Sequence, residues 1–267
     1  MKRPAVSHKG PFNFRLLDSR FTDYCVLNFA SGKSYPMGQA RLVDSLRRTG
    51  FKGDILAFED ESQFGAPTHQ EVPYAFKVSL IRYAQKLGYR FVLWCDSSVV
   101  ATGSLTEIFS MIDFFGCLFF RNGFLWEWIG DDALKKMNVQ RSYLEEKRVV
   151  EISASCFGLD LHEMGIQNFL SNWELRARDG SFNGAWNNAH GEVSSDLRVK
   201  GHRHDQSIAS LLVHQYGLPI QEGNACGYQY YKENGNTKNF EYGGENDEKF
   251  IYPRTVLIND GLPYPIA

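Results

Sequence analysis

The sequence lacks any close pair of cysteines. Its five cysteines are Cys25, Cys95, Cys117, Cys156 and Cys226, and none belongs to a Cys-x-x-Cys pair. This spacing argues against a zinc knuckle and against a redox motif. Most of these cysteines lie in apolar runs, where a thiol behaves as a small buried hydrophobe. Free thiols are typical of a reducing compartment, so we expect a cytoplasmic protein.

The sequence also has no apolar leader and no long uninterrupted hydrophobic run. The first eight residues carry charges but no apolar segment follows them, so no secretory signal is predicted. The most apolar stretch, residues 111–129, is interrupted by Asp113, Arg121 and Glu127. A bilayer span needs about 20 nearly uncharged residues. We therefore expect a buried or interfacial segment and no transmembrane helix, with peripheral membrane contact left open.

Neither sign of charge dominates the chain. Lysine and arginine number 29 against 31 aspartates and glutamates, which leaves a net charge of -2. A general nucleic-acid binder needs a basic surplus to neutralise phosphates, so nucleic acid is not an expected partner. The 267 residues show no internal repeat and no clean domain boundary. We expect one domain over residues 1–267, with a core at about 24–220 and a loop-rich C-terminal extension at 221–267.

What the sequence does contain is an alternation of apolar runs and helical patterns. Strands are predicted at residues 24–30, 54–58 and 90–95, and helices at 39–48, 73–87 and 104–112. Such alternation is typical of right-handed crossovers and of a mostly parallel sheet with helices on both faces. Further along, strands are predicted at 116–120, 149–159 and 255–258, helices from residues 160 and 205, and a long loop at 181–203. The expected fold class is α/β and Rossmann-like.

The strongest predicted strand ends in a polar group. Asp96 follows Val-Leu-Trp-Cys95 directly, and Ser97 and Ser98 come next. In open parallel sheets, ligands bind beyond the carboxyl ends of the strands, so Asp96 is well placed to touch a ligand or its metal. The alternative is that Asp96 and Ser98 only cap the turn into the next element.

The residues around this strand resemble a known family. The stretch from Pro73-Tyr-Ala-Phe-Lys77 to Leu-Trp-Cys-Asp96-Ser-Ser98 is similar to the GT-A glycosyltransferases, in which a helix leads into a strand that ends in Asp-x-Asp. Ser31-Gly32 and His202-Arg-His-Asp-Gln206 are similar to the donor entry and the active-site helix of the same superfamily. The resemblance covers roughly residues 24–220. It implies a three-layer GT-A sandwich, a nucleotide-diphosphate-sugar donor and a glycan or glycoconjugate acceptor.

The resemblance also implies which residues bind the donor and its cation. They are Asn28, Ser31 and Gly32 for the nucleoside, Lys77 for the phosphate or sugar, and Asp96 and Ser98 for the diphosphate. The family commonly places Mn²⁺ or Mg²⁺ between the motif and the donor phosphates. Here Ser98 stands at the second acidic position, so one carboxylate remains and metal affinity should be weaker. His202 or His204 could supply a second ligand, with His202 the first choice. For Lys77, a solvated surface lysine is the alternative.

The cluster His202–Gln206 is the other candidate for chemistry. Asp205 lies beside two histidines where a loop meets a helix, and its carboxylate could deprotonate an acceptor hydroxyl. The resemblance implies that Gln206 contacts the sugar or acceptor, and we expect His204 to join the catalytic group. The alternative is that Asp205 is only the N-cap of the helix.

Three tryptophans complete the predicted site. We expect Trp126, Trp128 and Trp186 to stack on acceptor sugar rings, although packing in the core is the commoner role for a single tryptophan.

The leading hypothesis is a hexosyl- or pentosyltransferase that uses a nucleotide sugar. Two alternatives stay open. A nucleotidyltransferase that makes sugar nucleotides would usually carry a Gly-rich basic loop, of which Gly32-Lys33 is a poor version. A carbohydrate-binding module without activity would explain Ser98 but not the cluster around Asp205.

Overall fold

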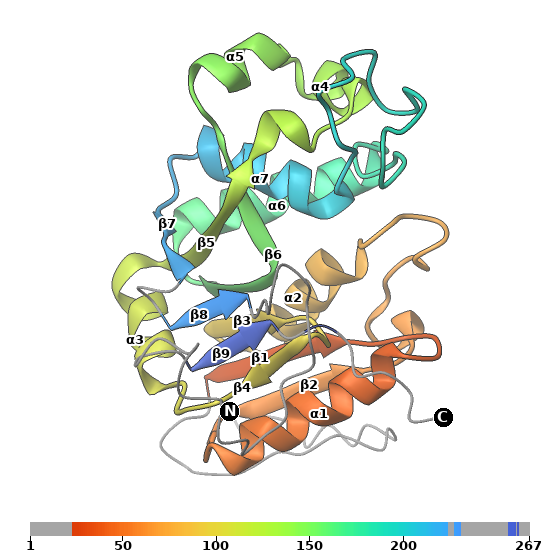
Figure 1. The fold of residues 1–267 in the computed structure, drawn as a ribbon. Coiled ribbons are helices and arrows are strands. Elements are labelled where there is room, and N and C mark those ends of the chain that lie inside the picture. The colour runs from red at the N-terminus through yellow and green to blue at the C-terminus, as the bar shows by residue number, and fades with distance from the viewer. Residues whose placement is uncertain (1–22, 224–226, 231–255, 260, 262–267) are drawn as a thin grey trace, which may run out of the picture.

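The computed structural model describes residues 23–223, 227–230, 256–259 and 261. Within them, a central sheet has the strand order β2-β1-β3-β6-β5-β7 (Figure 1). Its strands are β1 (Tyr24–Phe29), β2 (Asp54–Phe58), β3 (Phe91–Cys95), β5 (Cys117–Phe124), β6 (Val150–Asp160) and β7 (Ile220–Gln221). β1 is parallel to β2 and β3, and β5 is parallel to β7, whereas β6 is antiparallel to both of its neighbours. Of these six strands only β6 is reversed, which confirms the mostly parallel sheet.

Helices cover both faces of this sheet. They are α1 (Tyr35–Arg48), α2 (Phe76–Lys86), α3 (Thr106–Phe115), α6 (Met164–Arg178) and α7 (His204–Gln215). One apolar core packs α2, α6 and α7 against the sheet, with Trp94, Phe157 and Trp173 buried in it. A second core on the other face contains Leu42 of α1 and Ile108 of α3. The predicted three-layer α/β/α sandwich is therefore confirmed.

A small second sheet was not expected, although one of its strands corresponds to the strand predicted at residues 255–258. It has the order β4-β9-β8 and consists of β4 (Val99–Ala101), β8 (Tyr228–Tyr230) and β9 (Leu257–Asn259). β4 directly follows the Asp96–Ser98 turn, and Ala101 N donates to Ser45 Oγ of α1 at 2.9 Å. The predicted C-terminal extension thus contributes two strands to the core, while most of its other residues lie outside the described ranges.

Short helices also escaped prediction. They are η1 (Glu61–Phe64), η2 (Leu125–Glu127), α4 (Asp131–Met137) and α5 (Arg141–Glu146). Figure 1 shows α4, α5 and the loop of residues 181–203 gathered at one end of the molecule, beyond β5 and β6. Each of these helices has too few turns to give a clear 3.6-residue pattern, so their positions depend on packing.

Local rules explain the start of α1 but not the start of α3. α1 begins at Tyr35, a turn before the predicted start, because Pro36 suits the first turn of a helix. The helix predicted over residues 104–112 was expected to begin with a capping box, Ser104-Leu-Thr-Glu107, in which Ser104 and Glu107 would cap the helix N-terminus, but this box does not form. Ser104 Oγ accepts from Thr106 N at 3.3 Å, and the helix starts only at Thr106. Across the described residues, no helix is both long and apolar enough to cross a bilayer. The four described cysteines are free and buried, as expected.

Candidate active site

The site is centred on Lys77, near the start of α2. Its side chain is only 3% exposed, so it is not the solvated lysine of the alternative interpretation. Nζ donates to Ala154 O at 2.8 Å, and it lies 3.3 Å from Asp96 Oδ1 at the end of β3. Asp96 Oδ1 also accepts from Trp94 Nε1 at 2.7 Å. A buried ammonium is costly unless it is paired, so these contacts hold Lys77 in place.

Asp205 approaches the same ammonium from α7. Its Oδ2 lies 3.3 Å from Lys77 Nζ. Burial lowers the pKa of Lys77, but the carboxylates of Asp205 and Asp96 outweigh that effect and raise it above its usual value. Burial raises the pKa of Asp205 to about 6, against the opposing effect of Lys77. The N-cap of α7 is Arg203, so Asp205 is not the capping residue of the alternative interpretation.

A cavity of about 330 Å³ lies next to Asp96. Its aromatic walls are Phe29, Tyr35, His69, Tyr74 and Phe76, and its polar lining includes Ser31, Asp96 and Ser98. This size and this mixture of aromatic walls with a few polar groups are typical of a site for a small organic ligand. Ser31, Asp96 and Ser98 were predicted for this role, and the structure brings them to one cavity.

Tyr74 in this wall was missed by sequence reasoning. It adopts a φ of 60°, which is uncommon for a residue with a side chain and tends to occur at functional sites. Its ring stacks on the ring of His204 with centroids 5.3 Å apart. Burial and the nearby carboxylate of Asp205 raise the pKa of Tyr74 to about 12, so its hydroxyl stays protonated. The only sequence signal was its place between Pro73 and the start of α2.

Two predicted donor residues do not face the cavity. Asn28 is fully buried, donates to Cys95 O at 2.6 Å and accepts from Gln39 Nε2 at 2.7 Å. It therefore ties β1 to the end of β3, and the geometry does not support a contact with a donor. Gly32 turns the chain beyond β1 with a φ of 81° and is not among the residues that line the cavity.

The histidine cluster divides into two roles. His202 is fully buried, and its Nδ1 accepts from Gly130 N at 3.2 Å while Nε2 donates to Ser181 O at 3.0 Å. Burial lowers its pKa to about 4, so the ring is neutral. Both ring nitrogens are occupied, which corrects the prediction that His202 is a metal ligand. His204 donates from Nδ1 to Phe182 O at 2.8 Å, which leaves Nε2 as the acceptor nitrogen of its neutral form.

His204 packs against two aromatic rings that also contact each other. Its ring stacks on that of Tyr74 and on that of Trp186, the latter with a centroid distance of 5.8 Å, and the Tyr74 and Trp186 centroids lie 6.4 Å apart. Trp186 is 53% exposed, so this group of three rings reaches the surface. The guanidinium of Arg198 lies 5.2 Å from the ring of Trp126, and that of Arg203 lies 3.5 Å from the ring of Trp128. Trp186 is therefore the most exposed of the three predicted tryptophans, whereas Trp126 and Trp128 are each in contact with an arginine.

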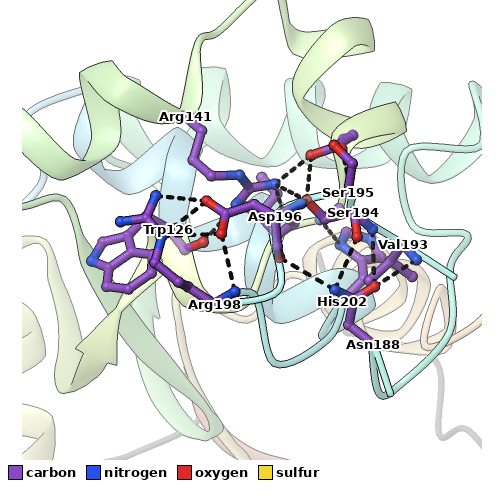
Figure 2. Close-up of polar contacts among 12 residues, drawn as sticks. Trp126, Arg141, Asn188, Val193, Ser194, Ser195, Asp196, Arg198 and His202 are labelled. Carbon is purple, nitrogen blue, oxygen red and sulfur yellow. Dashed lines mark hydrogen bonds and ion pairs between the residues drawn. The ribbon is translucent and has the colours of Figure 1, made fainter. Parts of the chain in front are cut away.

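The loop that carries Trp186 is fixed by an internal network (Figure 2). Asn188 Oδ1 accepts from the backbone of Val193 and of Ser194, both at 3.0 Å. Ser194 Oγ donates to Asp131 Oδ1 at 2.8 Å, and the same carboxylate oxygen lies 2.7 Å from Arg141 Nη2. The predicted long loop is therefore tied to α4 and α5.

A buried carboxylate near Gln206 was also missed. Glu151, at the start of β6, is fully buried, and its Oε2 accepts from Arg203 Nη1 and from Asn122 Nδ2, both at 2.7 Å. Burial raises the pKa of Glu151 to about 7, while Arg203, Asn122 and Gln206 act in the opposite direction. Its only sequence signal was a charge inside an otherwise apolar predicted strand.

The described residues offer a limited set of metal ligands. No group of three His, Cys, Asp or Glu side chains among them is arranged to hold a metal ion. Asp96 and Ser98 nevertheless present oxygen atoms to the same cavity. Mg²⁺ is commonly held by one or two carboxylates together with substrate phosphates and water. These residues therefore fit a divalent cation that takes most of its ligands from a bound polyphosphate.

Comparisons with known proteins identify the fold. No protein-family model and no curated protein matches the sequence. The apo structure of the bifunctional glycosyltransferase WbbM matches 92% of this chain and 47% of its own, at 14% identity and a TM-score of 0.55. Mouse xyloside xylosyltransferase 1 matches 91% of this chain and 100% of its own, at 11% identity and a TM-score of 0.46. The galactosyltransferase LgtC, solved with donor and acceptor sugar analogues, matches 77% of this chain and 75% of its own, at 12% identity and a TM-score of 0.42.

The likeness to WbbM is a likeness of fold. This chain spans about half of the WbbM chain, and the sheet order and flanking helices described above agree with a glycosyltransferase domain of the GT-A type. The GT-A fold expected from the sequence is therefore confirmed.

Proposed function

We propose that this protein is a glycosyltransferase that moves a sugar from a nucleotide-diphosphate donor to a hydroxyl of a glycan or glycoconjugate. The observation that carries this proposal is the single ammonium of Lys77, which joins Asp96 beside the aromatic cavity to Asp205 on α7. A GT-A fold with this arrangement has its cavity beyond the carboxyl ends of parallel strands, where open α/β sheets bind ligands.

The cavity suits the nucleotide part of the donor. A base or ribose would pack against Tyr35, His69 and Tyr74, since flat rings stack favourably on aromatic side chains. The diphosphate would then lie toward Asp96 and Ser98, at the polar end of the same cavity. Ser31 at the end of β1 offers a hydroxyl to the nucleoside.

The charges of the site favour a bound cation. Lys77, Asp96 and Asp205 together carry one net negative charge, and this charge alone would repel a diphosphate. A divalent ion, Mn²⁺ or Mg²⁺, would neutralise the diphosphate and stabilise it as a leaving group. Asp96 would be its protein carboxylate and Ser98 a second oxygen ligand. Lys77 would keep the Asp96 carboxylate in position.

Asp205 is the best candidate for the group that acts on the acceptor. Its pKa of about 6 makes it ionised at neutral pH and yet more basic than an ordinary aspartate, as suits a general base. Gln206 follows it on the first turn of α7, beside Glu151, and would bind sugar hydroxyls. His204 precedes Asp205 and packs against the rings of Tyr74 and Trp186. The open ring of Trp186 would bind the apolar face of an acceptor sugar.

The proposed function can be tested by identifying the products that the protein forms from nucleotide sugars. Purified protein would be incubated with UDP-glucose, UDP-galactose, UDP-xylose and GDP-mannose, each with Mn²⁺ and with EDTA, and with a panel of methyl glycosides. Release of nucleoside diphosphate together with a new glycoside is the expected result, and the donor that reacts separates hexosyl from pentosyl transfer. Pyrophosphate formation from a sugar phosphate and a nucleoside triphosphate would instead identify a nucleotidyltransferase. Binding of glycosides with no product would identify a carbohydrate-binding module.

The cysteines bear on the compartment of the protein. Cys25, Cys95, Cys117 and Cys156 are buried free thiols, which supports a reducing compartment such as the cytoplasm.

A further inference from the structure

Tyr74 lies between the cavity proposed for the donor and the residues proposed to act on the acceptor. Its side chain lines the cavity together with Asp96. Its ring also stacks on that of His204, the residue before Asp205, with centroids 5.3 Å apart. In the proposed reaction, the bond that breaks lies between the diphosphate at Asp96 and the base Asp205. Tyr74 is therefore placed beside that bond.

The backbone of Tyr74 is strained, and so is that of its stacking partner. Tyr74 has a φ of 60° and His204 a φ of 46°, both in the left-handed region that residues with a side chain rarely adopt. The strained turn at Tyr74 is held from the preceding loop, because His69 Nδ1 accepts from Tyr74 N at 3.2 Å. Such strain persists only where the surrounding structure enforces it, and it concentrates at functional sites. Two strained residues whose rings stack beside a cavity indicate that the position of the Tyr74 side chain serves function.

The hydroxyl of Tyr74 is a hydrogen-bond donor that awaits a ligand. Within the part of the chain that the structure describes, the side chain packs against the rings of His69 and His204, but its hydroxyl makes no hydrogen bond. The oxygen is not sealed in the core, so a molecule in the cavity can reach it. Burial and the carboxylate of Asp205 raise the pKa of this hydroxyl to about 12. It therefore offers its proton to a hydrogen bond without giving it up.

The charges around the cavity leave this role to a neutral group. Among the described residues that line the cavity there is no lysine and no arginine. The ammonium of Lys77 is already engaged by a backbone carbonyl and by the carboxylates of Asp96 and Asp205. The protein therefore meets a diphosphate bound there with neutral donors such as hydroxyls. A phenol is more acidic than the hydroxyl of a serine, and the more acidic O–H forms the stronger hydrogen bond to an anion.

We propose that Tyr74 is a catalytic residue of the glycosyl transfer, whose hydroxyl donates a hydrogen bond to the diphosphate oxygen that leaves the sugar. The anomeric C–O bond breaks and its electron pair goes to that oxygen, while a new C–O bond forms to the acceptor, whose proton passes to Asp205. Tyr74 keeps its own proton and stabilises the charge that develops. Such a hydrogen bond should contribute roughly 10- to 100-fold to kcat. This inference rests on the proposed function and adds a residue to it.

The test removes the hydroxyl and keeps the ring, in Tyr74→Phe. The matched control is Tyr143→Phe, because the ring of Tyr143 also packs against a histidine, His214, with centroids 5.9 Å apart, but Tyr143 does not line the cavity. Both variants and the wild type would be assayed with the reactive nucleotide sugar, once for transfer to an acceptor and once for hydrolysis by water. Calorimetry would give the donor affinity, and thermal unfolding the melting temperature.

Tyr74→Phe should lower kcat about 10- to 100-fold for transfer and for hydrolysis alike, because both reactions break the same bond to the diphosphate. Donor affinity should change far less, and Tyr143→Phe should behave like the wild type. A loss confined to transfer would place the hydroxyl at the acceptor, and a loss confined to donor affinity would make Tyr74 a binding residue only. Either result overturns the inference, as does an unchanged kcat.

The melting temperature decides whether the hydroxyl has a structural role instead. Because it makes no hydrogen bond within the described residues, Tyr74→Phe should melt like the wild type, and a clearly lower value would contradict the inference. Failure of the proposed function looks different, since the wild type itself would then release no nucleoside diphosphate from any nucleotide sugar. That outcome overturns the glycosyl transfer and the role of Tyr74 with it.

Discussion

Asp96 and Asp205 meet on one ammonium group. Each carboxylate has an oxygen 3.3 Å from Lys77 Nζ, although one follows the third strand of the sheet and the other lies on a helix more than a hundred residues later. The cation thus connects the group beside the donor cavity to the group proposed to act on the acceptor. The predictions below follow from this link and from its surroundings.

Replacing Lys77 should destabilise the fold. In Lys77→Met, Asp96 and Asp205 lose the cation that they share. Removing one partner of a buried ion pair costs about 3–5 kcal/mol of stability. Urea denaturation would measure the loss of unfolding free energy. Lys147→Met is the control, because Lys147 pairs with Glu146 at the surface, where such pairs contribute little to stability. Equal losses in both variants would show that the pairing of Lys77 is not a buried one.

Asp96→Asn should weaken donor binding. The amide keeps the shape of the side chain but cannot serve as an anionic ligand, so any enhancement of nucleotide-sugar binding by Mn²⁺ should disappear. Calorimetric titration of the reactive nucleotide sugar, with Mn²⁺ and with EDTA, would measure this effect. The same donor affinity in wild type and variant with Mn²⁺ present would remove Asp96 from the donor site.

Asp205→Asn should act on turnover. Loss of a general base lowers kcat by about 10²- to 10⁴-fold. Donor affinity should change far less, because the predicted donor contacts lie on the other side of Lys77. Steady-state kinetics of the variant, with melting temperature as a check on folding, separate the two effects. Normal kcat would leave the catalytic base unassigned.

The dependence of kcat/KM on pH should report the ionisation of Asp205. Burial raises the pKa of Asp205 to about 6, and only the ionised form can accept a proton, so kcat/KM should fall as pH drops through about 6. At pH values below about 6, kcat/KM should decrease tenfold for each pH unit. A profile of the wild type between pH 4.5 and 8 would measure this limb. A flat profile over that range would contradict the assignment.

Glu151 should make the free energy of unfolding fall as pH rises. Its pKa rises from an ordinary 4.5 to about 7 on folding, so the folded state binds the proton more tightly than the unfolded state. The free energy of unfolding contributed by this group therefore falls as pH rises from about 4.5 to 7 and is constant above that range. At about 1.4 kcal/mol per pKa unit, wild type should lose about 2 kcal/mol relative to Glu151→Gln between pH 5 and pH 8. Urea denaturation of both proteins at the two pH values measures this difference, and a constant difference would contradict it.

The sequence by itself determined the layout of the fold and the ends of its main strand. An apolar run such as Phe91–Cys95 must be buried on both faces, and the polar residue after it must lie at the edge of the sheet. The spacing of apolar residues likewise predicted the positions of most long helices, because this spacing is a local property of the chain. Asp96 and Asp205 were predicted as candidate site residues from their places at the end of a strand and the start of a helix, and Gln206 from the resemblance to the GT-A glycosyltransferases.

Only the tertiary structure decided what surrounds these residues. The sequence left Lys77 as a donor-binding residue or a surface lysine, and only the structure shows it buried against Ala154 of β6 and held between two carboxylates. His202 reads as a metal ligand until burial gives both ring nitrogens backbone partners. Glu151 is a single charge inside a predicted strand, and only the structure shows its ion pair with Arg203, the residue before α7. In each case the partner is distant in sequence, and burial and charge pairing depend on contacts that no local pattern encodes.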